Sequence, residues 1–274
     1  MKKVETRRMC PHCRAFITTS DKVCPYCDTP VGPSAKDRLG GADLFGGLIP
    51  SAQFVTVLLL TMNIGMYLVT MIAQAKIGEG NALIRYGAAL PEGVFGGQWW
   101  RIITAGFLHG GLMHIGFNMW ALMDVGRHAE ETYGAKRMSV IYLLSTMGGF
   151  ALSMVRGTPL TVGASAGLFG LIGAMIAIGV IHRNSHQAAA IKAFYIRWAI
   201  YGLLWGLLPM FHVDNAAHLG GMATGFVVAW AAGTPREFDV NRERFWSVMA
   251  GLSAAVTAYA FLRLFLWIQG MAAI

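Results

Sequence analysis

Several long apolar runs constrain this chain more than any other feature of its sequence. Each run is roughly 17–24 residues long, which is the length of helix that crosses a hydrocarbon core about 30 Å thick. Of the 274 residues, 55% are hydrophobic and only 13% are charged, whereas a soluble domain usually carries about 25% charged residues. The sequence therefore predicts an all-α polytopic membrane protein.

Turn signals between the apolar runs predict seven membrane-spanning helices. The expected spans are residues 52–75, 111–125, 137–155, 165–181, 191–208, 215–232 and 245–268. The second and sixth spans are short and rich in glycine, which indicates close packing inside a bundle. The connection 76–108 contains Trp99, Trp100 and Arg101, a combination typical of an anchor at the depth of the lipid headgroups.

The distribution of Lys and Arg predicts the orientation of the chain. Basic residues gather before the first span and after the second, fourth and sixth spans, and such segments are usually cytoplasmic. We therefore expect a multi-pass protein of the bacterial inner membrane with a cytoplasmic N-terminus and an external C-terminus. No cleavable signal is expected at the N-terminus. The net charge of +8 belongs to these loops, so no nucleic-acid partner is expected.

All four cysteines lie within residues 1–30, as two Cys-Pro-x-Cys pairs. The pairs are formed by Cys10 with Cys13 and by Cys24 with Cys27, and four thiolates suit a closed tetrahedral Zn²⁺ site. Redox activity and an iron site are the alternatives. A module this small needs the metal for folding, and residues 15–18 are expected to form a strand. Residues 31–50 read as a linker, and the partner of the module is unknown.

Three distant segments bring polar residues to one membrane depth. Ser165 opens the fourth span within a turn of small residues, His114 and Asn118 lie early in the second span, and His218 lies one turn into the sixth. All three spans run inward from the external face in the expected topology. Small residues are ordinary packing material in membranes, but ionisable residues at this depth indicate a functional site.

These residues have complementary chemical roles. Ser165 can act as a nucleophile and His218 as its general base. His114 and Asn118 share one helical face and can donate hydrogen bonds to an oxyanion together with the Ser165 backbone N–H. Small residues around them indicate close approach: Gly163 and Ala164 leave room for a substrate backbone, Gly167 lets the sixth span approach, and Gly220, Gly221 and Gly225 form the facing surface.

The combination of motifs resembles the rhomboid family of intramembrane serine proteases. The matching residues are Trp100-Arg101, His109 with His114 and Asn118, Gly126-Arg127 with Glu130 and Gly134, Gly163-Ala164-Ser165, and Ala217-His218-Leu219-Gly220-Gly221 with Gly225. The resemblance implies a six-helix core at residues 51–232, followed by a cytoplasmic loop and a seventh helix at residues 233–274.

The resemblance also implies a catalytic mechanism and a class of substrate. Ser165 and His218 would form a dyad without an essential acid, and His109 would support the first loop. Catalysis would need no cofactor, and the substrates would be transmembrane proteins in the lipid bilayer, cut near the external face. The zinc module is an addition that the resemblance does not explain.

Two residues depart from the family pattern near the nucleophile. Ala166 stands where family members often have glycine, and Phe169 stands where they often have a tyrosine on which the catalytic histidine stacks. We expect Phe169 to keep the ring face and to lose only the hydroxyl. Asp214, four residues before His218, suggests a triad, but an exposed N-cap of the sixth span is the preferred interpretation.

Two other functions are compatible with parts of the sequence. A catalytically inactive rhomboid-like protein would bind membrane helices without cutting them, and that class is expected to lack the serine or the histidine, which are both present here. A transporter or channel would place the histidines in a polar pathway. The sequence has no inverted repeat and no acidic residue at mid-membrane, so this function is disfavoured.

Overall fold

The computed structural model describes residues 7–10, 12–18, 21–29, 31, 53–208, 213–235 and 239–272. The chain divides into two compact units, Met1–Ser51 and Ala52–Ile274. Most of the predicted linker and the end of the predicted fifth span, at Pro209, lie outside the described residues.

A short antiparallel hairpin forms the described part of the first unit. Strand β1 (Arg7–Met9) pairs with β2 (Phe16–Thr18), and Met9 lies opposite Phe16. The predicted strand at residues 15–18 is therefore confirmed. The few buried side chains of this unit are Cys10, Ile17, Cys24 and Val31, so the core consists largely of the cysteines themselves.

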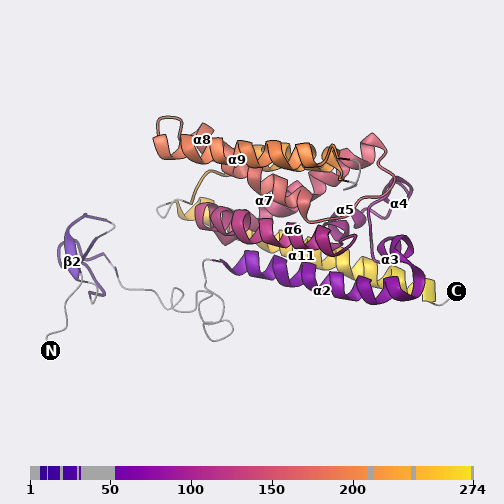
Figure 1. Cartoon of the computed structure of the whole chain (residues 1–274). Coiled ribbons are helices and arrows are strands. Elements are labelled where there is room, and N and C mark those ends of the chain that lie inside the picture. The colour runs from indigo at the N-terminus through magenta and orange to yellow at the C-terminus, as the bar shows by residue number, and fades with distance from the viewer. Residues whose placement is uncertain are drawn as a thin grey trace, which may run out of the picture. The chain divides into compact units, whose positions relative to one another are not determined.

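The second unit is a bundle of helices whose long members run roughly parallel to one another (Figure 1). The helices are α2 (Phe54–Ile77), α3 (Glu79–Arg85), α4 (Pro91–Phe95), α5 (Arg101–Thr104), η2 (Ala105–Phe107), α6 (Leu112–Ala121), η3 (Leu122–Gly126), α7 (Arg127–Arg156), α8 (Ser165–Ile181), α9 (His186–Trp205), α10 (Asn215–Ala232) and α11 (Val240–Ala272). Within the described residues, Phe54–Ile77, Leu112–Arg156 and Val240–Gly270 are long and apolar enough to cross a membrane, and Ser165–Ile181 is a shorter apolar helix. The all-α polytopic class is confirmed.

The second predicted span is longer than its sequence signals indicated. Helix α6 continues through the π-helical η3 into α7 without interruption until Gly134, where φ is 74° and ψ is 157°. His114, at the start of α6, lies against Gly163, which follows the end of α7. The chain therefore reverses at Gly134, which creates two antiparallel segments each about 33 Å long.

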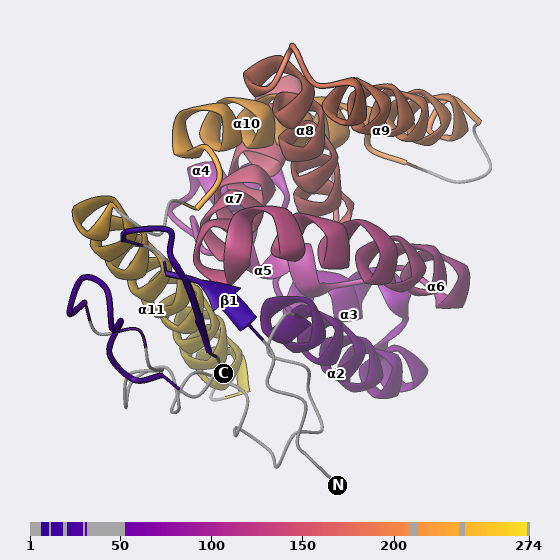
Figure 2. The same cartoon turned by 90° about the vertical axis from the view of Figure 1, so that its left-hand side faces the viewer.

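Helix α8 occupies the middle of the bundle. It contacts α7, α9 and α10, and Figure 2 shows α8 between α10 and α9. Gly173 allows α10 to pack closely, because a Cβ there would stand 2.2 Å from the Met222 carbonyl oxygen of α10, whereas a Cβ at Gly170 would overlap the Ser145 side chain of α7. Gly221 makes the reciprocal contact with the Ala166 carbonyl group. The prediction that the sixth span packs on the fourth through glycine is confirmed.

Gly167 has a different neighbour from the one we predicted. A Cβ at Gly167 would stand 2.6 Å from Cε2 of Tyr142 and 2.7 Å from Oγ1 of Thr146, both on α7. It therefore allows the third span, not the sixth, to come close. The error arises because α8 is buried nearly all round, so its helical periodicity does not distinguish one partner from another.

Two buried charged groups fix the ends of the outer helices. The Glu130 carboxylate accepts hydrogen bonds from the backbone N–H groups of Val55 and Thr56, both at 2.9 Å, and from the Thr56 hydroxyl at 2.7 Å. It thereby caps the first turn of α2. Arg137 on α7 forms two hydrogen bonds, of 2.9 and 2.6 Å, with Glu243 on α11.

Candidate active site

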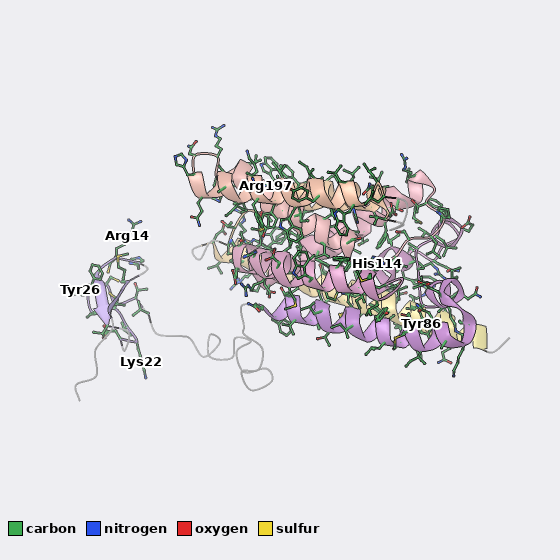
Figure 3. The ribbon with its side chains drawn as sticks, viewed as in Figure 1. Arg14, Lys22, Tyr26, Tyr86, His114 and Arg197 are labelled. Atoms are coloured by element: carbon green, nitrogen blue, oxygen red, sulfur yellow. The ribbon has the colours of Figure 1, made fainter. Side chains whose placement is uncertain are left out.

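Ser165, His114 and Gly163 lie close together in the bundle, and Figure 3 labels His114 on α6. A Cβ at Gly163 would stand 2.7 Å from Nε2 of His114 and 3.6 Å from Oγ of Ser165. Gly163 also has a φ of 130°, which L side chains rarely adopt. Glycine is therefore required here by both space and backbone conformation, and the space it leaves is filled in part by the His114 imidazole.

His218 lies on the face of α8 that carries Ser165. Its ring stacks on Phe169 with 4.0 Å between the ring centroids and an interplanar angle of 11°. Phe169 follows Ser165 by four residues, so the two side chains are neighbours on one helical face. His218 is only 5% exposed. Stacking on a phenylalanine therefore holds the imidazole one helical turn from the serine.

No strong hydrogen bond fixes the His218 ring within the described part of the chain. There, its Nδ1 has no hydrogen-bond partner, and no hydrogen bond joins it to Ser165. Hydrogen bonds between catalytic groups are often long in a free enzyme and shorten when substrate binds. Ser165 and His218 are thus placed through Phe169, which carries the stacked imidazole one turn after the serine on α8.

His114 presents a hydrogen-bond donor towards the serine turn. Its Nδ1 accepts from the backbone N–H of Gly110 at 3.4 Å, so the neutral ring carries its proton on Nε2, the atom that faces Gly163. Asn118 donates one amide hydrogen to the His114 carbonyl oxygen at 2.8 Å and keeps its second hydrogen for another acceptor.

His109 supports the turn that precedes Ser165. It is fully buried, and its Nε2 accepts from the backbone N–H of Ala164 at 3.5 Å. The ring also meets His114 edge to face, with 5.0 Å between centroids. These two contacts link the end of the first loop to both the serine turn and the start of α6.

Asp214 is the N-cap of α10. One oxygen accepts from the Ala217 backbone N–H at 3.0 Å, and the other accepts a short hydrogen bond from the Ser153 hydroxyl on α7. The cap was predicted, but the carboxylate is half-buried and bonded to α7 rather than freely exposed. Sequence reasoning missed Ser153, whose only signal was a polar residue late in an apolar span.

The extra methyl group of Ala166 faces Gly149 of α7. Ala166 is fully buried, and a Cβ at Gly149 on α7 would stand 2.8 Å from the Ala166 Cβ. Glycine at residue 149 therefore provides the space that alanine at residue 166 requires.

Arg101 organises the connection between α2 and α6 from inside. It is 2% exposed, and its Nη1 donates to the carbonyl oxygens of Ile84 and Ala88 at 2.9 and 2.8 Å. Burial lowers the pKa of Arg101 to about 10, so the group stays charged at neutral pH. The neighbouring Trp100 is 4% exposed, and the prediction that it anchors at headgroup depth is wrong, because α11 covers it.

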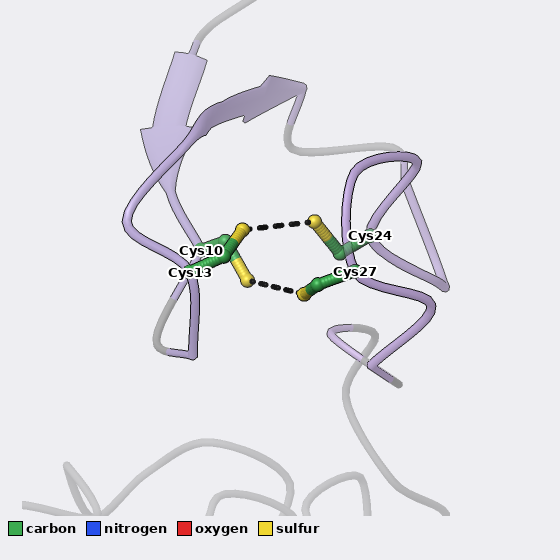
Figure 4. A group of neighbouring side chains, drawn as sticks. All are labelled: Cys10, Cys13, Cys24 and Cys27. Atoms are coloured by element: carbon green, nitrogen blue, oxygen red, sulfur yellow. Dashed lines mark hydrogen bonds between the residues drawn. The ribbon is translucent and has the colours of Figure 1, made fainter.

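The four cysteines form a second candidate site in the first unit (Figure 4). Their sulfur atoms all lie within 4.8 Å of one another, and the cross-pair distances are 3.8 Å for Cys10–Cys27 and 3.6 Å for Cys13–Cys24. A tetrahedral Zn²⁺ ion with bonds of about 2.3 Å would hold its sulfur ligands about 3.8 Å apart. The donor set therefore fits this metal.

Both Cys-Pro-x-Cys turns adopt the same backbone form. Arg14 and Asp28, which follow the second cysteine of each pair, have φ of 61° and 54°. Their N–H groups donate to the carbonyl oxygens of Cys10 and Cys24, each at 3.0 Å. Hydrogen bonds with the Thr29 side chain and backbone lower the pKa of Cys27 to about 5, which favours the thiolate that binds metal.

Comparisons with known proteins agree with these observations. The family model described as "Rhomboid domain" matches residues 96–235. The chain is similar to "Rhomboid protease GluP" of Bacillus subtilis (strain 168), with 32% identity over 181 residues, which are 66% of this chain and 35% of that protein. It is also similar to "RHOMBOID-like protein 5" of Arabidopsis thaliana, with 36% identity over 49% of this chain and 44% of that protein.

A third relative carries a different label. It is "Inactive RHOMBOID-like protein 8" of Arabidopsis thaliana, with 39% identity over 126 residues, which are 44% of this chain and 35% of that protein. The matched part of the chain thus spans less than half the length of each of these three relatives.

Proposed function

The chain belongs to the rhomboid family, and from that premise we propose that it is an intramembrane serine endopeptidase. It cleaves transmembrane protein substrates near the external membrane face with a dyad of Ser165 and His218. The supporting observation is the stack of His218 on Phe169, 4.0 Å between centroids, one helical turn from the serine. This stack holds the base without any carboxylate, since Asp214 is engaged with Ala217 and Ser153.

The proposed reaction uses the groups in sequence. His218 takes the hydroxyl proton as Oγ of Ser165 bonds to the scissile carbonyl carbon, and returns that proton to the leaving amine when the C–N bond breaks. The oxyanion accepts hydrogen bonds from the Ser165 backbone N–H, from Nε2–H of His114 and from the second amide hydrogen of Asn118. Water then hydrolyses the acyl-enzyme ester and regenerates the serine.

Fluorophosphonate labelling and cleavage of membrane substrates test the proposal together. The wild type should label at Ser165 and cut a model transmembrane substrate, whereas Ser165→Ala should do neither and His218→Ala should lose cleavage with its fold intact. Ser247→Ala and His186→Ala are matched controls, because both residues are exposed, and should behave as wild type. Labelling of Ser165→Ala equal to wild type would remove Ser165 as nucleophile.

The alternative is a catalytically inactive protein that binds membrane helices. Two observations favour considering it: one similar protein is named inactive, and no hydrogen bond joins Ser165 to His218 within the described residues. The same experiment separates the two functions. A wild type that retains substrate helices, without labelling or cleavage, would be the binding protein.

For the cysteine module we infer a structural Zn²⁺ site on the cytoplasmic side of a bacterial inner membrane. The four thiols supply all ligands of a closed site, so the ion folds the module and takes no part in catalysis. Metal analysis should find about one zinc per chain, and the variant with Cys10 and Cys13 both replaced by serine should have none. A membrane-impermeant thiol reagent should reach these cysteines only after the membrane is opened; labelling in intact cells would reverse the orientation.

A further inference from the structure

The outer part of α11 lies against the connection between α2 and α6. Tyr259 stacks on Trp99 with 5.9 Å between ring centroids, and Phe261 meets Phe107 edge to face at 5.3 Å. Leu264 is buried, and its Cδ1 would lie 3.2 Å from a Cβ placed on Gly87. Side chains on a broad part of the α11 surface therefore contact this loop over about two helical turns.

Two arginine–tryptophan pairs join α11 to the connection between α2 and α6. In one pair the arginine belongs to α11, and in the other the tryptophan does. The Arg263 guanidinium of α11 lies over the Trp100 ring, 4.7 Å from its centroid. The Arg101 guanidinium of the loop lies over the Trp267 ring of α11, at 4.6 Å. Each element thus contributes one cation and one indole, and such pairs strengthen when they are shielded from water.

Arg101 connects α11 to the segment that precedes the catalytic serine through a series of hydrogen bonds. The same guanidinium that meets Trp267 donates to the carbonyl oxygens of Ile84 and Ala88. The next residue, Ala89, exchanges two backbone hydrogen bonds, of 3.1 and 2.9 Å, with Thr161.

A second hydrogen bond joins the connection between α2 and α6 directly to the turn that precedes Ser165. The backbone N–H of Gly163 donates to the Ala105 carbonyl oxygen at 2.9 Å, and Ala105 lies four residues after Arg101 in the segment formed by α5 and η2. The segment from Thr161 to Ser165 is therefore hydrogen-bonded to the loop at two points, and both points depend on the conformation around Arg101.

We propose that Trp267 and Arg263 of the seventh helix are positioning residues for Ser165, acting through Trp100 and Arg101. The inference rests on the proposed protease function, although its structural part does not. The opposite end of α11 is attached independently by the ion pair between Arg137 and Glu243. Weakening the outer contacts should therefore loosen the serine turn and leave α11 in place.

The test compares three α11 variants of the full-length protein in detergent. Trp267→Leu removes the ring over Arg101, and Trp267→Phe keeps a ring there. Phe265→Leu is the matched control, because this aromatic side chain is 55% exposed on the same helix. The measurements are the rate constant for fluorophosphonate labelling of Ser165, kcat and KM for a transmembrane substrate, and hydrogen exchange of residues 161–165.

We expect Trp267→Leu to lower the labelling rate constant and kcat at least fivefold, with KM changed less than twofold. Exchange of the backbone N–H groups of Thr161 and Gly163 should accelerate at least tenfold, because their acceptors lie in the loop. Trp267→Phe should recover most of both effects, and Phe265→Leu should match the wild type. Arg263→Met and Arg263→Lys should reproduce the loss and the recovery if Trp267→Leu does not fold.

Three results would overturn the inference. The first is wild-type labelling and exchange in Trp267→Leu, whatever its melting temperature. The second is an equal loss in Phe265→Leu, which would show that any damage to α11 suffices. The third is a Trp267→Leu variant whose kcat is lower at unchanged KM but whose hydrogen exchange at residues 161–165 is no faster than in the wild type. A wild type that does not label at all contradicts the proposed function instead, and the exchange measurement still decides whether α11 holds the serine turn.

Discussion

Replacing Phe169 with tyrosine would restore the hydroxyl often found at this place in the family, and we expect it to destabilise this protein. Cζ of Phe169 points at Gly202 of α9: a Cβ on that glycine would stand 2.6 Å from Cζ and 3.2 and 3.6 Å from the two Cε atoms. Because Cζ is nearest and the two Cε distances are similar, Gly202 lies beyond the end of the ring. A tyrosine hydroxyl would therefore meet the backbone of α9.

The expected cost has two parts. Forcing extra volume into a packed contact costs about 1–3 kcal/mol, and burying a hydroxyl without a partner costs about 1–3 kcal/mol more. The sum is about 2–6 kcal/mol, and each kcal/mol lowers Tm by roughly 2–4 °C in a protein of this size class. Phe169→Tyr should therefore melt at least about 4 °C below the wild type, while the ring that supports His218 is kept.

Thermal unfolding of purified protein in detergent measures this effect. Phe95→Tyr adds the same hydroxyl to a ring that is 68% exposed and should leave Tm within about 1 °C. Gly202→Ala places a methyl group against the end of the Phe169 ring and should also lower Tm. A Phe169→Tyr variant as stable as the wild type would refute the tight packing of α8 on α9 and the reasoning built on it.

Two further predictions concern the packing of α7. Gly149→Ala should cost about 1–3 kcal/mol, and adding Ala166→Gly should recover part of this stability, since the Ala166 methyl group is one of its two close contacts; equal stability of the single and double variants would contradict that geometry. Glu243→Leu should cost about 3–5 kcal/mol by stranding the Arg137 side chain, which is 1% exposed. Arg137→Leu should cost less, because the Glu243 side chain is 27% exposed and can hydrate; thermal unfolding that finds the reverse order would show that burial does not govern this pair.

Helix positions with clear boundary chemistry were predictable from the sequence. The fourth and sixth spans agree with α8 and α10 at both ends, because a turn of small residues precedes Ser165 and an aspartate cap precedes Asn215. The second span was placed too short because Asp124 and Arg127 suggest a helix end. The helix continues past Asp124 in the π-helical η3 and past Arg127 in α7, and the break comes only at Gly134.

Tertiary partners were harder to predict than helices. Gly167 was correctly expected to permit close approach, but its neighbour is α7, and the sequence gives no means of ordering neighbours around a helix that is buried on all sides. Trp100 was expected at the membrane surface because tryptophan next to arginine is typical there. It is buried because Arg263, more than 160 residues later in the sequence, lies over its ring.

Some features of the candidate site could be predicted from the helix positions alone, and others depended on tertiary contacts. Four polar residues on three spans were expected at one depth, and this expectation needed only the topology. The neutral tautomer of His114, which depends on the Gly110 N–H, and the bond between Ser153 and Asp214 needed the coordinates. The catalytic role of each residue stays a prediction.

The Glu130 cap has a consequence for how the chain assembles during synthesis. The carboxylate that satisfies the first turn of α2 lies 75 residues downstream of Val55, so the first helix enters the membrane before its cap has been translated. Until then its leading N–H groups depend on water or headgroups at the bilayer surface. The first turn of α2 therefore stays at the level of the bilayer surface, and the hairpin that turns at Gly134 must pack beside it before this turn is capped within the protein.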